Sequence, residues 1–121
     1  MRAALETRRA TLGPDHPEIA SSLVVLASLA RDRHDAASAE AQYREALAIR
    51  LKRLGQTSPQ AAMAQVGLAE VLLDRGDRGS RAEAESLLNP ALATLRAALK
   101  PGQADLVRAE AAQRRTLTAP R

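Results

Sequence analysis

The sequence predicts an all-α fold in which antiparallel pairs of helices stack on one another. Ala and Leu supply most of the apolar residues, while the chain has no Phe, no Trp and a single Tyr. Ala and Leu favour helices, and the β-branched and aromatic residues that favour strands are few. Short motifs also recur at a long, fixed spacing, as they do when one helical hairpin is repeated along a chain. With 121 residues, the chain is expected to form one domain.

The repeat is 42 residues long over most of its length. Leu12-Gly13 recurs 42 residues later as Leu54-Gly55. The same spacing joins Pro17 with Pro59 and Leu26-Ala27 with Leu68-Ala69. Beyond Asp77 the spacing becomes 45, so that Tyr43 matches Leu88. The three extra residues fall in a stretch rich in Gly and charge, which predicts a lengthened surface turn.

Each repeat is predicted to hold two helices joined by a polar turn. The first helix begins at a Pro, which the first turn of a helix tolerates, and Asp15 or His16 is expected near its N-cap. Apolar residues then recur three and four positions apart, and a Gly ends the second helix. The chain is therefore expected to be one helical-repeat domain, 1–121, with four parts: 2–13, the second helix of a truncated repeat; 17–55, a full repeat; 59–100, a full repeat with the lengthened turn; and 103–117, a terminal capping helix.

Pro90 lies inside the second helix of the second full repeat. An interior Pro has no N–H to donate and costs a helix about 3 kcal/mol. A bend near Asn89 is expected from this.

Small residues at the helix crossings resemble those of a known family. Ala27 and Ala69 stand where the two helices of each repeat cross. The second helices carry the series Ala39, Tyr43, Ala46 and the series Ala84, Leu88, Ala91. Helices packed about 8–10 Å apart need small side chains at such points. These residues resemble the tetratricopeptide-repeat family, and the 42-residue period is similar to the longer repeats of kinesin light chain and its bacterial relatives. Over about residues 1–100, the resemblance implies a tetratricopeptide-type α-solenoid, a right-handed superhelix of helix hairpins.

The resemblance implies a protein-interaction scaffold. A peptide or helical segment of a partner would lie in the concave groove lined by the first helices. The expected groove residues are Ser21, Val24, Val25, Ser28 and Arg31 from one repeat and Met63, Val66, Glu70 and Leu73 from the next. Alternatively, Val24, Val66 and Leu73 pack against a neighbouring helix. The Asn pair that light-chain repeats use to hold a peptide backbone is replaced by Val24-Val25 and Val66-Gly67, so that mode of binding is in doubt.

A second hypothesis is a structural or regulatory tail. In this case the repeats self-associate into a homo-oligomer or dock on another domain of a larger polypeptide. The start in the middle of a repeat and the small number of full repeats favour this alternative, because about three repeats are needed for a stable stack.

No catalytic, metal or cofactor site is predicted, so the chain is not expected to be an enzyme. Without Cys there are no disulfides and no thiolate chemistry. The only histidines are His16 and His34, and the segment Asp32-Arg33-His34-Asp35 does not match a known metal-ligand spacing. No motif for a nucleophilic Ser or for phosphate binding occurs.

Nucleic acid and membranes are not expected partners either. The net charge is only +4, and the basic residues Arg44, Arg50, Lys52 and Arg53 lack the aromatic residues on which bases stack. The longest apolar run, 22–30, is too short to span a bilayer. An Arg pair, Arg8-Arg9, stands where a secretory signal would need its apolar stretch. The chain is expected to be cytoplasmic.

Overall fold

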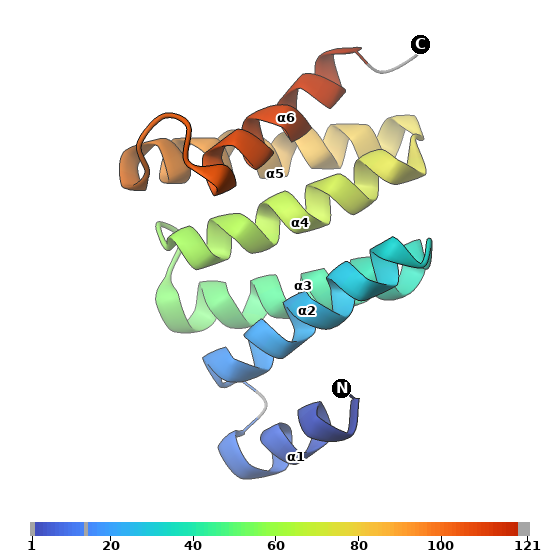
Figure 1. The fold of residues 1–121 in the computed structure, drawn as a ribbon, viewed down its shortest axis with the longest axis vertical. Coiled ribbons are helices and arrows are strands. Elements are labelled where there is room, and N and C mark those ends of the chain that lie inside the picture. Colours follow the sequence, from blue (N-terminus) through green and yellow to red (C-terminus); the bar gives the residue numbers. More distant parts are fainter. Residues whose placement is uncertain (1, 14, 119–121) are drawn as a thin grey trace.

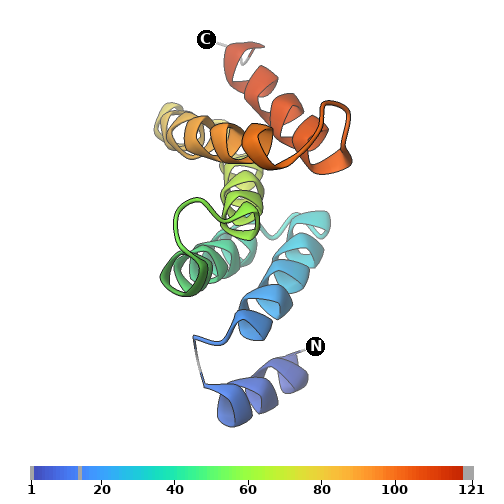
Figure 2. The ribbon, with the colours of Figure 1, turned by 90° about the vertical axis from the view of Figure 1, so that its left-hand side faces the viewer.

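A computed structural model of the chain describes residues 2–13 and 15–118. Within these residues it contains six α-helices and no strand: α1 (Arg2–Leu12), α2 (Pro17–Asp32), α3 (Ala36–Leu54), α4 (Pro59–Arg75), α5 (Arg78–Ala98) and α6 (Ala104–Thr118). Figure 1 shows α2, α4 and α6 in a front layer and α3 and α5 behind them. The view turned by 90° shows the same two layers from the side, with α1 at one end of the stack (Figure 2). The predicted all-α fold is confirmed.

Polar side chains begin the helices where the sequence indicates. The imidazole Nδ1 of His16 accepts a hydrogen bond from the backbone N–H of Glu18 at 3.1 Å, so the predicted N-cap of α2 is confirmed. The other N-caps are Asp35 for α3, Ser58 for α4 and Asp77 for α5. Each accepts a hydrogen bond from the backbone N–H three residues later, which satisfies a donor that the first turn leaves free.

The lengthened turn predicted for the second full repeat is wrong. α4 ends at Arg75 and α5 begins at Arg78, so only two residues separate the helices. The extra residues lengthen the helix instead, because Asp77 caps α5 directly after the turn and α5 has 21 residues where α3 has 19. Three residues make nearly one turn of an α-helix, about 3.6 residues, so Ala84 and Leu88 still face the core.

α5 continues through Pro90 without interruption. The ring of Pro90 is exposed, and the carbonyl of Ser86, four residues earlier, receives no N–H from it. The proline therefore does not break the helix, and the bend near Asn89 stays a prediction.

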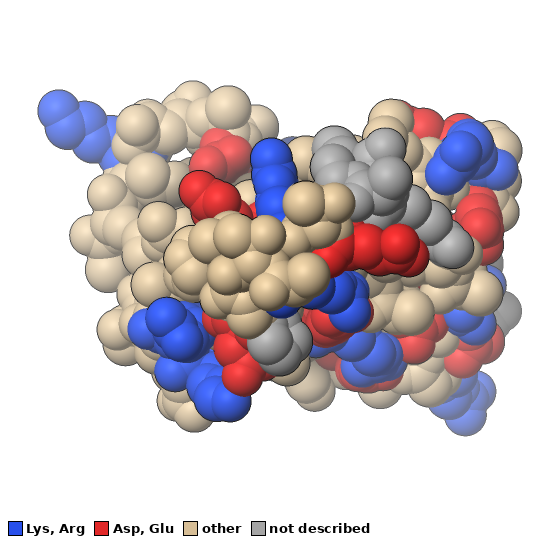
Figure 3. Space-filling view, turned by 90° about the horizontal axis from the view of Figure 1, so that it is seen from below, with Lys and Arg blue, Asp and Glu red and all other residues tan. Residues whose placement is uncertain are grey.

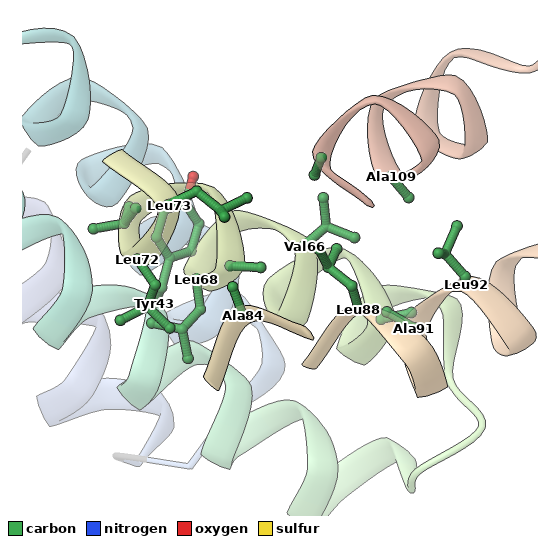
Figure 4. Close-up of a cluster of buried hydrophobic side chains, with 14 of the residues drawn as sticks. Tyr43, Val66, Leu68, Leu72, Leu73, Ala84, Leu88, Ala91, Leu92 and Ala109 are labelled. Atoms are coloured by element: carbon green, nitrogen blue, oxygen red, sulfur yellow. The ribbon is translucent and has the colours of Figure 1, made fainter. Parts of the chain in front are cut away.

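Tyr43, the single aromatic residue, is central to the larger of two hydrophobic clusters. Figure 4 shows its ring beside Leu68 and Leu72 of α4. The ring fits because Gly67 faces it: a Cβ atom at Gly67 would lie 2.3 Å from Cε1 of Tyr43. The smaller cluster joins α1, α2 and α3 through Leu5, Ile19, Ala20, Leu23, Leu26, Ala46 and Ile49.

Candidate partner-binding groove

The concave side of the molecule is a groove with α4 as its floor and α2 and α6 as its walls. These three helices lie side by side in both ribbon views (Figures 1 and 2). Two hollows open along the groove. The apolar hollow, of about 450 Å³, is lined by Val24, Arg50, Pro59, Gln60, Met63, Leu95, Leu99 and Asp105. The charged hollow, of about 700 Å³, is lined by Arg31, Asp32, His34, Ala36, Val71, Asp74 and Arg115.

The apolar hollow lies between Val24 of α2 and the first turns of α4 and α6. Val24 and Met63 are half-buried and belong to the rim of the core, so part of each side chain remains open to solvent. A Met side chain is flexible and adapts to differently shaped apolar groups. This end of the groove is suited to the apolar side chains of a bound segment.

The charged hollow is built around a shared carboxylate. Asp74 of α4 accepts a hydrogen bond from Nε of Arg31 at 2.6 Å and another from Nη2 of Arg115 at 3.0 Å. Two guanidinium groups thus meet one carboxylate, and all three side chains remain partly exposed. With Asp32, the lining holds two Arg and two Asp side chains, so this end of the groove is suited to a charged or polar group of a ligand rather than to an apolar one.

Between the two hollows, Glu70 joins the same three helices. It is only 8% exposed, and its carboxylate accepts hydrogen bonds from Nε and Nη2 of Arg108 on α6, the shorter at 2.5 Å. Nη1 of Arg31 on α2 lies 3.6 Å from the same carboxylate. Ion pairs to Glu70 and Asp74 therefore hold both walls of the groove against its floor.

These ion pairs make the stability of the fold depend on pH. Burial alone would raise the pKa of Asp74, but the hydrogen bonds from Arg31 and Arg115 outweigh it and lower the pKa below the ordinary 3.8. The hydrogen bond from Arg44 likewise lowers the pKa of Glu83. A carboxyl group whose pKa is lowered by folding stabilises the folded state at pH values above its ordinary, unfolded-state pKa. This contribution is lost as the pH falls through the folded-state pKa.

We therefore expect thermal unfolding to be independent of pH between about 7 and 5 and to shift to lower temperature below about 4. Circular dichroism melts at a series of pH values measure this. The variant Asp74→Asn should show a shallower acid-side decrease than the parent. An equally steep decrease in both would mean that Asp74 does not contribute to it.

The expected groove residues fall into three groups. Val24, Arg31 and Met63 line the hollows. Ser21 and Ser28 are exposed beside them on α2. Val25 is exposed, but it lies about 100° around α2 from Val24 and lines neither hollow.

For the other three residues, the structure corrects the expectation of an open surface. Val66 is fully buried in the core cluster that includes Leu106 and Ala109 of α6, and Leu73 is buried in the same cluster. Glu70 is covered by Arg108. The reason is that α6 packs along α4, so the alternative of packing against a neighbouring helix holds for Val66 and Leu73. A substitution at Val66 would report on folding rather than on binding.

Sequence reasoning missed Asp74, Arg108 and Arg115 as groove residues. A signal was present, because Arg108 and Arg115 are seven residues apart and so share one face of a helix. Glu70 and Asp74, four apart, form a matching acidic pair on α4. The sequence alone does not indicate that the basic pair lies against the acidic pair, because this depends on where α6 packs.

The basic residues of α3, of which Arg50 also lines the apolar hollow, are largely engaged within the chain. Arg44 pairs with Glu83 at 2.7 Å, Lys52 with Asp15 at 2.5 Å, and Nη1 of Arg50 donates to the carbonyl of Gln60. In the described parts of the chain, no group of three or more His, Cys, Asp or Glu residues is placed to hold a metal ion. No helix among them is long and apolar enough to cross a bilayer.

Residues 1–52 match the family model described as tetratricopeptide repeat. The matched segment contains α1, α2 and nearly all of α3. A search of curated proteins finds no match to the chain.

Proposed function

Residues 1–52 belong to the tetratricopeptide-repeat family, and from this premise we propose that the chain binds a segment of a partner protein in the groove over α4. Tetratricopeptide repeats are in general protein–protein interaction modules and form a non-catalytic scaffold. The finer part of the proposal is the place and the kind of ligand: a short peptide or helical segment that lies along α4 between α2 and α6.

One observation carries the proposal: the two hollows lie along the same groove and differ in chemistry. The apolar hollow offers Val24 and Met63, and the charged hollow offers two Arg and two Asp side chains: Arg31, Arg115, Asp32 and Asp74. A ligand with apolar side chains at one end and charged or polar groups at the other would satisfy both. Such a polarised groove also sets the direction in which the ligand lies.

The proposal treats the chain 1–121 as one binding domain. The repeat 17–55 supplies α2, the repeat 59–100 supplies α4, and the terminal segment 103–117 supplies most of α6. All three parts are needed to form the groove, so a chain without α6 would lose binding.

The experiment is a selection from a displayed library of random 12-residue peptides, followed by affinity measurements on two variants. We expect the double variant Val24→Glu, Met63→Glu to weaken binding of the selected peptides at least tenfold, because each change places a charge in the apolar hollow. Circular dichroism confirms that the variants remain helical.

Leu54→Glu is the matched control, since Leu54 is an exposed apolar residue at the end of α3, outside both hollows. This variant should bind as the parent does. Selected peptides that bind the folded groove variant and the parent with equal affinity would contradict the proposed site.

A further inference from the structure

Arg50 of α3 brings a positive charge into the apolar hollow without a carboxylate to balance it. Its side chain is half-buried and lines the hollow. Nη1 donates one hydrogen bond, at 3.0 Å, to the backbone carbonyl of Gln60. The guanidinium group forms no ion pair with any residue that the structure describes. Because a guanidinium group has five N–H donors, most of them remain available to a ligand.

Other basic residues of the chain are placed differently. On α3 itself, Arg44 pairs with Glu83 at 2.7 Å and Lys52 pairs with Asp15 at 2.5 Å. Figure 3, a view from the α1 end of the molecule, shows basic and acidic side chains interspersed on that face. A half-buried cation without an acidic neighbour, as at Arg50, is therefore not the general arrangement on this molecule.

The repeat shows that Arg50 stands at a position suited to an apolar residue. Forty-five residues on, its counterpart is Leu95 of α5, which is fully buried in the larger hydrophobic cluster. Burial of Arg50 lowers the pKa of its guanidinium group, since the charged form loses part of its hydration. Such a conflict between a residue and its surroundings is typical of a functional site.

Asp105 is the one other charged residue in the lining of the hollow, and it does not neutralise Arg50. It lies in the first turn of α6, is exposed, and forms no ion pair with Arg50. An exposed carboxylate keeps its hydration, and solvent screens its charge. Arg50 has less water around it, so a new hydrogen-bonded partner stabilises Arg50 more than it stabilises Asp105.

The hollow also lies within the stack of helices. Its lining comes from five helices, with Val24 of α2, Arg50 of α3, Met63 of α4, Leu95 of α5 and Asp105 of α6. The hollow is therefore open because of the shape of the groove, and not because one end of the stack is uncovered.

We infer that the partner segment carries an acidic residue whose side-chain carboxylate pairs with Arg50 in the apolar hollow. The methylene groups of this side chain pack against Val24 and Met63, while the carboxylate accepts hydrogen bonds from the guanidinium group. Glu suits the hollow better than Asp, because its longer stem brings more apolar surface. The inference rests on the proposed function and adds the chemistry of the ligand at this end of the groove.

The test uses the tightest peptide from the selection on the parent chain. The displayed peptides are joined to their carrier through the C-terminus, so that only side chains offer carboxylates. The peptide is synthesised with an amidated C-terminus, and each acidic residue is replaced in turn by its amide counterpart. We expect one of these replacements to weaken binding to the parent about tenfold. The same replacement should change binding to the variant Arg50→Gln less than about twofold, because the guanidinium group is absent.

Arg53→Gln is the matched control. It removes the same charge from the same helix, but Arg53 is exposed and lines neither hollow. This variant should keep the tenfold preference for the acidic peptide. Arg50→Leu, which introduces the residue found at the matching position in the next repeat, should lose the preference as Arg50→Gln does. It takes the place of Arg50→Gln if circular dichroism shows that the Gln variant is not helical.

The inference is overturned if the selected peptides contain no acidic residue, or if the amide replacement weakens binding to the parent and to Arg50→Gln equally. It is also overturned if light scattering shows that the parent dimerises and that Arg50→Gln abolishes the dimer, because a second copy then supplies the carboxylate. Failure of the proposed function has a different signature: the variant Val24→Glu, Met63→Glu would bind the peptides as tightly as the parent.

Discussion

Replacing Gly67 with Ala should destabilise the chain by about 3 kcal/mol, although Ala is the better helix former by about 1 kcal/mol. The new methyl group would lie 2.3 Å from Cε1 and 2.6 Å from Cζ of Tyr43, well inside van der Waals contact. Tyr43 is buried against α4 and cannot move aside without disturbing the largest core cluster. The free energy of unfolding in urea, measured by circular dichroism, gives the result.

Two further variants test whether the clash with Tyr43 causes the loss of stability in Gly67→Ala. Gly79→Ala in α5 should leave the stability unchanged or raise it by about 0.5 kcal/mol, since the nearest atom to a Cβ there is 3.5 Å away. Tyr43→Leu should make Gly67→Ala less harmful than it is in the parent, because Leu ends short of the new methyl group. A Gly67→Ala chain as stable as the parent would show that α3 and α4 are not as close as the structure has them.

Glu70→Ala should cost about 2–3 kcal/mol, the second largest effect expected. It removes a nearly buried carboxylate and leaves Arg108, about half buried, without its partner on α4. The loss of the contact with Arg31 adds to this. Because Arg108 and Arg31 are partly exposed, water compensates some of the loss, and the expected cost is below that of a fully buried pair.

Glu83→Ala provides the comparison for Glu70→Ala. Glu83 forms an equally close pair with Arg44, but both side chains are about two-fifths exposed. Its removal should cost no more than about 0.5 kcal/mol. Urea unfolding of both variants measures the difference, and equal effects would argue against Glu70 as the residue that holds α6 to α4.

Most of the fold could be predicted because local chemistry defines the helix ends. His16, Gly55 and Gly76 occupy the cap positions that their side chains or backbones favour. The turn after Gly76 was mispredicted for the opposite reason: Gly and charged residues also occur in a first helical turn when a cap such as Asp77 precedes them. The local composition alone does not distinguish a lengthened turn from the capped first turn of a helix.

The groove was only partly predictable, because it depends on how α6 packs. The spacing of Val24, Arg31 and Met63 placed them on the correct side of their helices. The burial of Val66 and Leu73 and the ion pairs of Arg108 and Arg115 arise from contacts between segments some 40 residues apart. Such contacts leave no periodic signal in a single sequence.

The most direct test of the groove is a methyl NMR spectrum of the chain with and without a selected peptide. We expect the methyl signals of Val24 and Met63 to shift on binding, whereas those of Leu54 on the opposite layer should not. Shifts at Leu54 without shifts at Val24 and Met63 would contradict the central claim that the partner lies over α4.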